Sequence, residues 1–223
     1  MPSDTGDTGA SETMRGWKFL ERDRVAPFGG HAWPAPGSGA PGDWIQPPGG
    51  EVFACRSSDL PWWVNAELWE VELAAPIRTL PTQIVGRRGR LLRRIAGWDE
   101  VALRAYGVAC AERARDVAVS LLVREGRTSA ADALRQTRGP LELYRVAQAL
   151  ATDAATRGAT VVGYVAAAAL RAAEGAAAAA AHHAADAAVV ADGTPGALER
   201  EVEWQARWIG ERAGLPVPMM ARV

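Results

Sequence analysis

Alternating apolar and polar positions in the first part of the chain predict β-strands. Trp69, Val71 and Leu73 alternate with Glu70 and Glu72, which is the period of a strand with one buried face. Four more short apolar runs lie between clusters of proline and glycine, at residues 17–20, 51–55, 82–86 and 90–95. Runs of this length with such boundaries are typical of a small β-rich domain.

The spacing of the apolar residues changes near Trp98. From Leu103 to Leu121 they recur at intervals of three and four, which predicts one long amphipathic helix. Asp99 is the expected N-cap of this helix, and Gly126 is expected to end it. An earlier stretch, SDLPWW at residues 58–63, is expected to form a turn or a single helical turn.

Further helices are expected at 128–137, 141–157, 160–192 and 197–213. Thr128 or Ser129 is the expected cap of the first, and Pro140 suits the start of the second. Gly175 is expected to break the alanine-rich third segment. Burial of apolar surface stabilises a fold by about 25 cal/mol per Å². Faces made of alanine bury little apolar surface, so they contribute little stability. We therefore expect the helices to depend on a few large anchors: Tyr106, Tyr144, Tyr164, Trp204 and Trp208.

Together these patterns predict an α+β protein with two parts. A small tryptophan-rich β domain, 15–97, precedes an alanine-rich antiparallel helical bundle, 98–215. The polar ends are expected to be tails, a disordered one at 1–14 and a C-terminal one at 216–223.

Composition narrows the classes of partner. The formal net charge of −1 argues against bulk attraction to nucleic acid or to a membrane surface. The two cysteines do not suggest a disulfide framework, and the polar, acidic start lacks the apolar core of a signal peptide. The uncharged apolar runs are shorter than the roughly 20 residues that span a bilayer. We therefore expect a cytoplasmic bacterial protein, and its arginine-rich, alanine-rich composition is typical of a GC-rich genome.

The tryptophan-rich part holds the candidate ligand-binding residues. Trp33, Trp44 and Trp62 lie beside proline or glycine and are candidates to line an aromatic pocket, although core packing is expected for most tryptophans. His31 lies in the glycine-containing loop GGHAWP. The other candidates follow in the chain: Cys55, Arg56 and Asp59. Cys55 is better explained as a buried strand cysteine than as a nucleophile, because no histidine lies near it in the sequence.

Two other groups invite a chemical interpretation. His182, His183 and Asp186 share a helix face, but no further ligands accompany them, so no metal site is predicted. Five arginines cluster at the end of the β domain, at positions 87, 88, 90, 93 and 94. A nucleic-acid surface is the less favoured explanation, and pairing with Glu70 and Glu72 on a neighbouring strand is the preferred one.

Residues 16–99 carry a series of short motifs: WKFL, PF, WP, ACR, DLPWW, LWEVEL, RGRLLRR and WD. In these motifs the segment resembles an uncharacterised bacterial domain family that is frequent in actinobacteria. The resemblance implies no activity, because the family has no known function. One position departs from the family pattern: Phe53 stands where a histidine is expected before Ala54 and Cys55.

Residues 99–215 resemble, more loosely, a helical family labelled as putative immunity proteins of polymorphic toxin systems. The motifs that carry this resemblance are CAERARDV, AAAHHAADAA and EREVEWQARW. The resemblance implies a protein partner.

The leading functional hypothesis is therefore a non-catalytic, immunity-like binding protein that recognises a protein partner. An alternative is an enzyme similar to ADP-ribosyltransferases, in which His31 or Arg56 contacts a nicotinamide cofactor and Glu70 or Glu72 orients the acceptor. A specialised-metabolism enzyme with a tryptophan-lined small-molecule pocket is a further alternative. Whether the protein is an enzyme stays open at this point, and the sequence identifies no cofactor.

Overall fold

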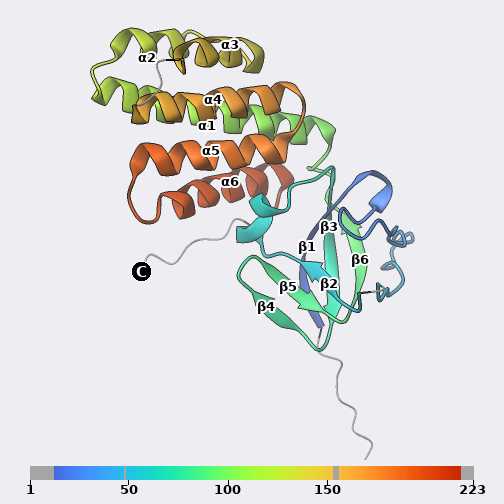
Figure 1. Ribbon diagram of the computed structural model, residues 1–223. Helices are drawn as coiled ribbons and strands as arrows, with labels where there is room; N and C mark the ends of the chain where they lie inside the picture. Colours follow the sequence, from blue (N-terminus) through green and yellow to red (C-terminus); the bar gives the residue numbers. More distant parts are fainter. Residues whose placement is uncertain (1–12, 48, 153–155, 217–223) are drawn as a thin grey trace, which may run out of the picture. The chain divides into compact units, whose positions relative to one another are not determined.

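The computed structural model describes residues 13–47, 49–152 and 156–216, and the chain divides into two compact units (Figure 1). The strand unit comprises the residues up to Arg56 together with Glu67–Ile95, and the helical unit comprises Ser57–Ala66 and the residues from Ala96 onward. The predicted α+β class is confirmed. The short 3-10 helix η2 (Ser57–Trp62) groups with the α-helices, although strands flank it in the sequence.

The strand unit contains two antiparallel three-stranded sheets. The first sheet has the order β1 (Thr13–Leu20), β3 (Glu67–Ala74), β6 (Arg88–Arg94). The second has the order β2 (Val52–Ala54), β5 (Gln83–Gly86), β4 (Arg78–Leu80). Each predicted apolar run thus contributes a strand. Of the predicted N-terminal tail, Thr13 and Met14 belong to β1, and residues 1–12 lie outside the described residues, as do 217–223 of the C-terminal tail.

The glutamates of β3 pair with arginines of β6, as the sequence predicts. Glu70 lies opposite Arg93 and Glu72 lies opposite Arg90, and each pair is joined by an ion pair of 2.7 Å. A bulge at Leu92 lets arginines three residues apart face glutamates two residues apart. Glu72 is only 9% exposed, and its strand β3 lies between β1 and β6.

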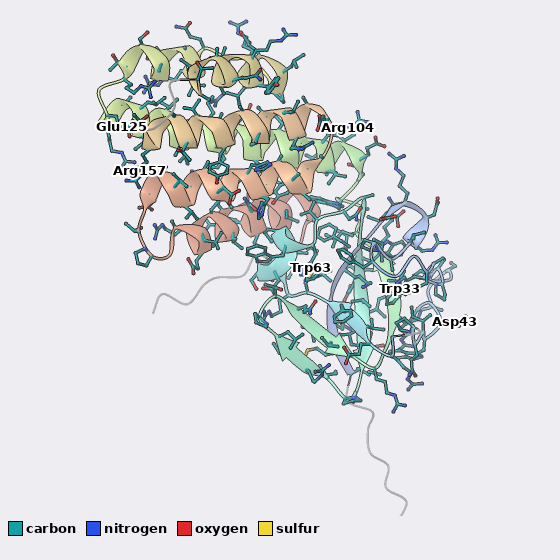
Figure 2. The ribbon with its side chains drawn as sticks, in the orientation of Figure 1. Trp33, Asp43, Trp63, Arg104, Glu125 and Arg157 are labelled. Atoms are coloured by element: carbon teal, nitrogen blue, oxygen red, sulfur yellow. The ribbon has the colours of Figure 1, made fainter. Side chains whose placement is uncertain are left out.

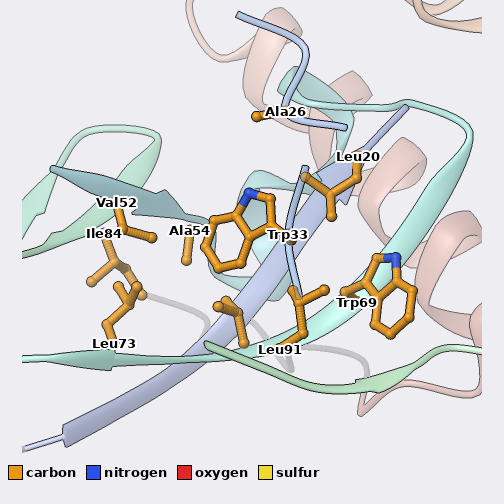
Figure 3. Close-up of a cluster of buried hydrophobic side chains, with 10 residues drawn as sticks. Leu20, Ala26, Trp33, Val52, Ala54, Trp69, Leu73, Ile84 and Leu91 are labelled. Atoms are coloured by element: carbon orange, nitrogen blue, oxygen red, sulfur yellow. The ribbon is translucent and has the colours of Figure 1, made fainter. Parts of the chain in front are cut away.

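The other face of β3 contributes to the hydrophobic core of the strand unit. Trp69, Val71 and Leu73 belong to a cluster built around Trp33, which is only 2% exposed (Figure 3). Gly89 of β6 makes room for this ring, because a Cβ at this position would lie 3.2 Å from the Trp33 ring and 2.7 Å from Val52.

The helical unit contains six α-helices within the described ranges: α1 (Glu100–Arg124), α2 (Thr128–Arg135), α3 (Pro140–Leu150), α4 (Arg157–Ala173), α5 (Ala177–Asp192) and α6 (Ala197–Ala213). Asp99 caps α1 as predicted, accepting a hydrogen bond of 2.7 Å from the Ala102 amide. Pro140 begins α3, and Gly126 and Gly175 follow the ends of α1 and α4. The predicted side-chain cap of α2 is wrong, because Thr128 is already helical and Arg127 precedes it.

Small residues let the helices of this unit pack closely. A Cβ at Gly107 of α1 would lie 3.2 Å from the Cα of Ala177 in α5. Arg157, labelled in Figure 2, lies at the start of α4. It donates a hydrogen bond of 2.6 Å to the carbonyl oxygen of Val190 near the end of α5. No helix in the described ranges is long and apolar enough to cross a membrane.

The predicted anchors of the helical unit are mostly wrong. Tyr106 is fully buried, but the other four aromatic residues, Tyr144, Tyr164, Trp204 and Trp208, keep part of their surface exposed. Other large residues are fully buried instead: Trp98, Leu122, Leu134 and Ile209. The Trp98 indole donates a hydrogen bond of 2.9 Å to the carbonyl oxygen of Asn65.

The ion pair between Glu72 and Arg90 gives a test of the strand unit. We expect Glu72→Ala to lower the free energy of unfolding by about 1–3 kcal/mol, because Glu72 is buried and also accepts a hydrogen bond of 3.1 Å from Thr13. Glu51→Ala is the matched control, since Glu51 pairs with Arg78 at the surface, and we expect it to change stability by less than about 0.5 kcal/mol. Chemical denaturation followed by tryptophan fluorescence measures both. Equal losses for the two variants would contradict this account.

Candidate functional site

The predicted ligand-binding residues do not all belong to one unit. His31, Trp33, Trp44, Cys55 and Arg56 lie in the strand unit. The remaining two, Asp59 and Trp62, lie in η2 of the helical unit. Asp59 is buried and accepts a hydrogen bond of 3.3 Å from Ser58, whereas Trp62 is 45% exposed.

Trp33 is held in the core by a strained turn that follows β1. Its amide donates a hydrogen bond of 3.0 Å to the Arg24 carbonyl oxygen, and the Arg24 side chain donates one of 3.1 Å to the Trp33 carbonyl oxygen. Asp23 and Arg24 both have φ of 60°, in the left-handed region that favours glycine. Left-handed backbone at such residues costs about 1–2 kcal/mol each, and this type of strain concentrates at functional sites.

Lys18 points from β1 toward the same ring. Lys18 lies opposite Trp69 in the sheet, so it shares the core-facing side of β1 with Leu20. Its ammonium nitrogen lies 5.1 Å from the centre of the Trp33 ring and donates a hydrogen bond of 2.7 Å to the Phe53 carbonyl oxygen. No carboxylate in the described part of the chain pairs with it. Burial lowers the pKa of Lys18 to about 8, and the electrostatic interaction with Cys55 partly opposes this shift.

Two polar ring nitrogens, of Trp33 and of His31, are buried without a hydrogen-bond partner among the residues that the structure describes. They are Nε1 of Trp33 and Nε2 of His31. The His31 ring stacks on the Trp33 ring, with 6.1 Å between their centres. A buried polar atom without a partner costs about 1–3 kcal/mol, so its presence requires an explanation. We refer to Lys18, His31, Trp33 and the Phe53 carbonyl group as the Lys18 cluster.

The other candidates of the strand unit contact their own chain. The Cys55 thiol donates a hydrogen bond of 3.3 Å to the Trp17 carbonyl oxygen, and Cys55 is buried, as expected. Arg56 donates hydrogen bonds to the carbonyl oxygens of Leu80 and Pro81, at 3.4 and 2.5 Å. Both side chains therefore support the local fold.

Trp44 forms a separate site from the Lys18 cluster. The guanidinium groups of Arg88 and Arg90 lie 5.6 and 4.6 Å from the centre of its ring. These cation–π contacts explain the position of Trp44 in its proline-rich loop. Arg88 and Arg90 belong to the arginine-rich segment for which a nucleic-acid surface was the less favoured explanation, and both therefore already contact Trp44.

Phe28 is the most exposed large apolar residue that the structure describes, at 88%. It lies at the tip of the loop that connects Val25 to Ala32 and is called the Phe28 loop below. The sequence analysis did not select it, because a single phenylalanine between proline and glycine carries no motif of its own.

The helical unit has a buried polar network around Glu201, which is 1% exposed. Arg113 pairs with Glu201 at 3.2 Å, and Gln205 donates a hydrogen bond of 3.4 Å to Glu201. Gln205 also accepts a hydrogen bond of 3.1 Å from the Tyr106 hydroxyl. Burial raises the pKa of Glu201, although Arg113 partly opposes this effect. Burial also raises the pKa of Tyr106 and of Cys110, so both stay protonated and neither is a nucleophile.

The two adjacent histidines lie near Asp186 but do not form a metal site in the described part of the chain. The nearest carboxylate oxygen of Asp186 is 3.9 Å from His182 and 3.7 Å from His183. No group of three or more histidine, cysteine or acidic residues suited to a metal ion occurs in these ranges.

Neither Lys18 nor Glu201 was selected from the sequence. One signal was available for Lys18: it is the only lysine among 25 lysine and arginine residues, and it interrupts the apolar run WKFL. No comparable signal marks Glu201, because it is one of several charged residues in the segment EREVEW.

No protein-family model, curated protein or solved structure matches this chain. Functional inference therefore depends on the geometry of the strand unit and of the helical unit.

The raised pKa of Glu201 predicts a pH effect on stability. The folded state binds this proton more tightly than the unfolded state, so stability falls as the pH rises above the ordinary glutamate pKa. We expect Glu201→Gln, which keeps a hydrogen-bonding side chain for Gln205 and Arg113, to remove this part of the decline. Its stability relative to the wild type should therefore increase from about pH 4 to about pH 7.

Denaturation at several pH values measures this difference. Glu203→Gln is the matched control on the same helix, because Glu203 is partly exposed and pairs with the exposed Arg207. A wild-type protein that gained stability relative to Glu201→Gln as the pH rose would show that the sign is wrong.

Proposed function

We propose that this protein is a non-catalytic binding protein, immunity-like in its helical half, that recognises a protein partner through the Phe28 loop. The observation that carries the proposal is the 88% exposure of Phe28 on an ordered loop. Exposed aromatic side chains are enriched in the buried centres of protein interfaces, where they supply a large apolar contact area.

The backbone of the Phe28 loop is held by its own hydrogen bonds. Val25 and Ala32 form an antiparallel bridge, and the Ala26 amide donates to the His31 carbonyl oxygen at 2.9 Å. The Gly30 amide donates to the Ala26 carbonyl oxygen at 2.9 Å, and Gly30 has a φ of 62°, which glycine adopts without strain. A loop ordered before binding loses less conformational entropy when a partner binds, which favours an interaction role.

The contacts of the polar candidates favour binding over catalysis. The enzyme alternative assigns Glu70 or Glu72 to an acceptor, but arginines of β6 engage both carboxylates. It assigns Arg56 to a cofactor, but Arg56 donates to backbone carbonyl groups of its own chain. Side chains that are held by such intramolecular contacts stabilise the fold of the strand unit.

Substitution of Phe28 tests the proposal. We expect Phe28→Ser to weaken binding of the natural partner at least tenfold, which corresponds to about 1.4 kcal/mol, because an aromatic anchor is lost. The partner is identified by mass spectrometry after affinity purification from the native host at native expression. Its dissociation constant is then measured by calorimetry with both purified proteins.

Val101→Ser is the matched control, since Val101 is an exposed apolar residue of α1 in the helical unit. We expect it to bind like the wild type. Failure to recover a specific partner would contradict the binding proposal. Loss of binding in Val101→Ser but not in Phe28→Ser would instead assign the interface to the helices and reject the Phe28 anchor.

A further inference from the structure

Lys18 occupies a position that is unusual for a charged side chain. It lies on the core-facing side of β1, where its neighbours two residues away are Gly16 and Leu20, both buried. Among the described residues, its ammonium group has one hydrogen-bond acceptor, the Phe53 carbonyl oxygen, and one aromatic face, that of Trp33. An ammonium group can donate three hydrogen bonds, so this environment solvates it incompletely.

The choice of lysine at this position is also distinctive. All other basic side chains among the 25 lysine and arginine residues are arginines, including those on the surface strand β6. A guanidinium group stays protonated under all ordinary conditions, whereas a buried lysine amine can lose its proton and become a nucleophile. Lysine therefore offers chemistry at this position that arginine does not.

We propose that Lys18 is a carbonyl-reactive amine, and that the Lys18 cluster is a site at which a small aldehyde forms an imine with its side-chain nitrogen. This site is distinct from the Phe28 anchor, and it does not depend on the proposed protein partner.

The reaction needs no oxidant or reductant. The lone pair of the neutral amine attacks the carbonyl carbon, a C–N bond forms, and the carbonyl oxygen takes up a proton while the nitrogen loses one. The carbinolamine then loses water as the nitrogen lone pair forms the C=N bond. One amine and one aldehyde thus give one imine and one water.

The surroundings of Lys18 favour the neutral amine that this step requires. Burial lowers the pKa of Lys18 to about 8, so the neutral fraction near pH 7.5 is roughly two hundred times that of an ordinary lysine. Lys18 as a whole residue is only partly buried. Trp33 and His31 of the same cluster hold polar nitrogens that are buried without a hydrogen-bond partner among the described residues.

Reductive trapping tests the proposal on the full-length protein. The probe is propionaldehyde with sodium cyanoborohydride near pH 7.5, and peptide mass spectrometry measures the rate of alkylation at Lys18. N-acetyl-lysine amide in the same solution is the reference. We expect Lys18 to react at least about tenfold faster than the reference, with a pH–rate midpoint near 8.

The label at position 18 should be lost in Lys18→Arg and in Lys18→Met. Both variants should keep the label on the N-terminal amine, which shows that the reagent is active. Cys55→Ser should keep the Lys18 label, which excludes labelling through the neighbouring thiol. A rate at Lys18 equal to or below that of the reference, or labelling only after denaturation, would overturn the proposal. Because the wild-type rate is itself decisive, the test does not depend on whether the Lys18 variants fold.

Discussion

The strand unit depends on the position of β3 between two neighbouring strands. Hydrogen bonding to β1 and β6 on both sides removes Glu70 and Glu72 from most of the solvent, so their charges need cations on the adjacent strands. Arg93 and Arg90 supply these cations from β6. Since the arginines are three residues apart and the glutamates two, the bulge at Leu92 is required if both ion pairs are to form. The arginine-rich sequence of β6 is thus explained by the charges of β3.

The same constraint applies to Glu201 and Lys18, and it is met differently in the two units. In the helical unit, Glu201 pairs with Arg113 and accepts a hydrogen bond from Gln205, so its network is largely satisfied. In the strand unit, the described residues provide Lys18 with a carbonyl oxygen and an aromatic ring but no carboxylate. A buried charge that is paired with an opposite charge has a structural role, whereas an incompletely solvated amine has a perturbed pKa that favours a reactive role. This difference assigns a structural role to Glu201 and a chemical one to Lys18.

The sequence predicted those features that depend on local spacing. Alternation identified β3, and glycine and proline identified most of the helix boundaries, because these signals act within a few residues. The bulge at Leu92 was not predictable, since it arises from the register between two strands. The anchors of the helical unit were mostly missed for a related reason. In alanine-rich helices the apolar face is nearly continuous, so the sequence does not show which large residue points inward.

The candidate site was predicted in part. The sequence selected Trp33 and His31 as candidates to line a pocket. Trp33 does lie outside the strands and helices, but its ring packs in the hydrophobic core, 5.1 Å from the Lys18 ammonium nitrogen.

The Phe28 loop and the Lys18 cluster are connected by a short length of backbone, yet their chemistry is separable. The segment from Val25 to Trp33 carries Phe28 at its exposed tip, the half-buried His31 after it, and the buried Trp33 at its end. Backbone hydrogen bonds hold this loop, so removal of the Phe28 side chain leaves every identified contact of Lys18 in place. Conversely, the contacts of Lys18 identified among the described residues are with the Trp33 ring and the Phe53 carbonyl group. A substitution of Phe28 or of Lys18 therefore reports on its own site. If movement of the whole loop coupled the two sites, the protein partner and the aldehyde would each change the affinity of the other by the same factor.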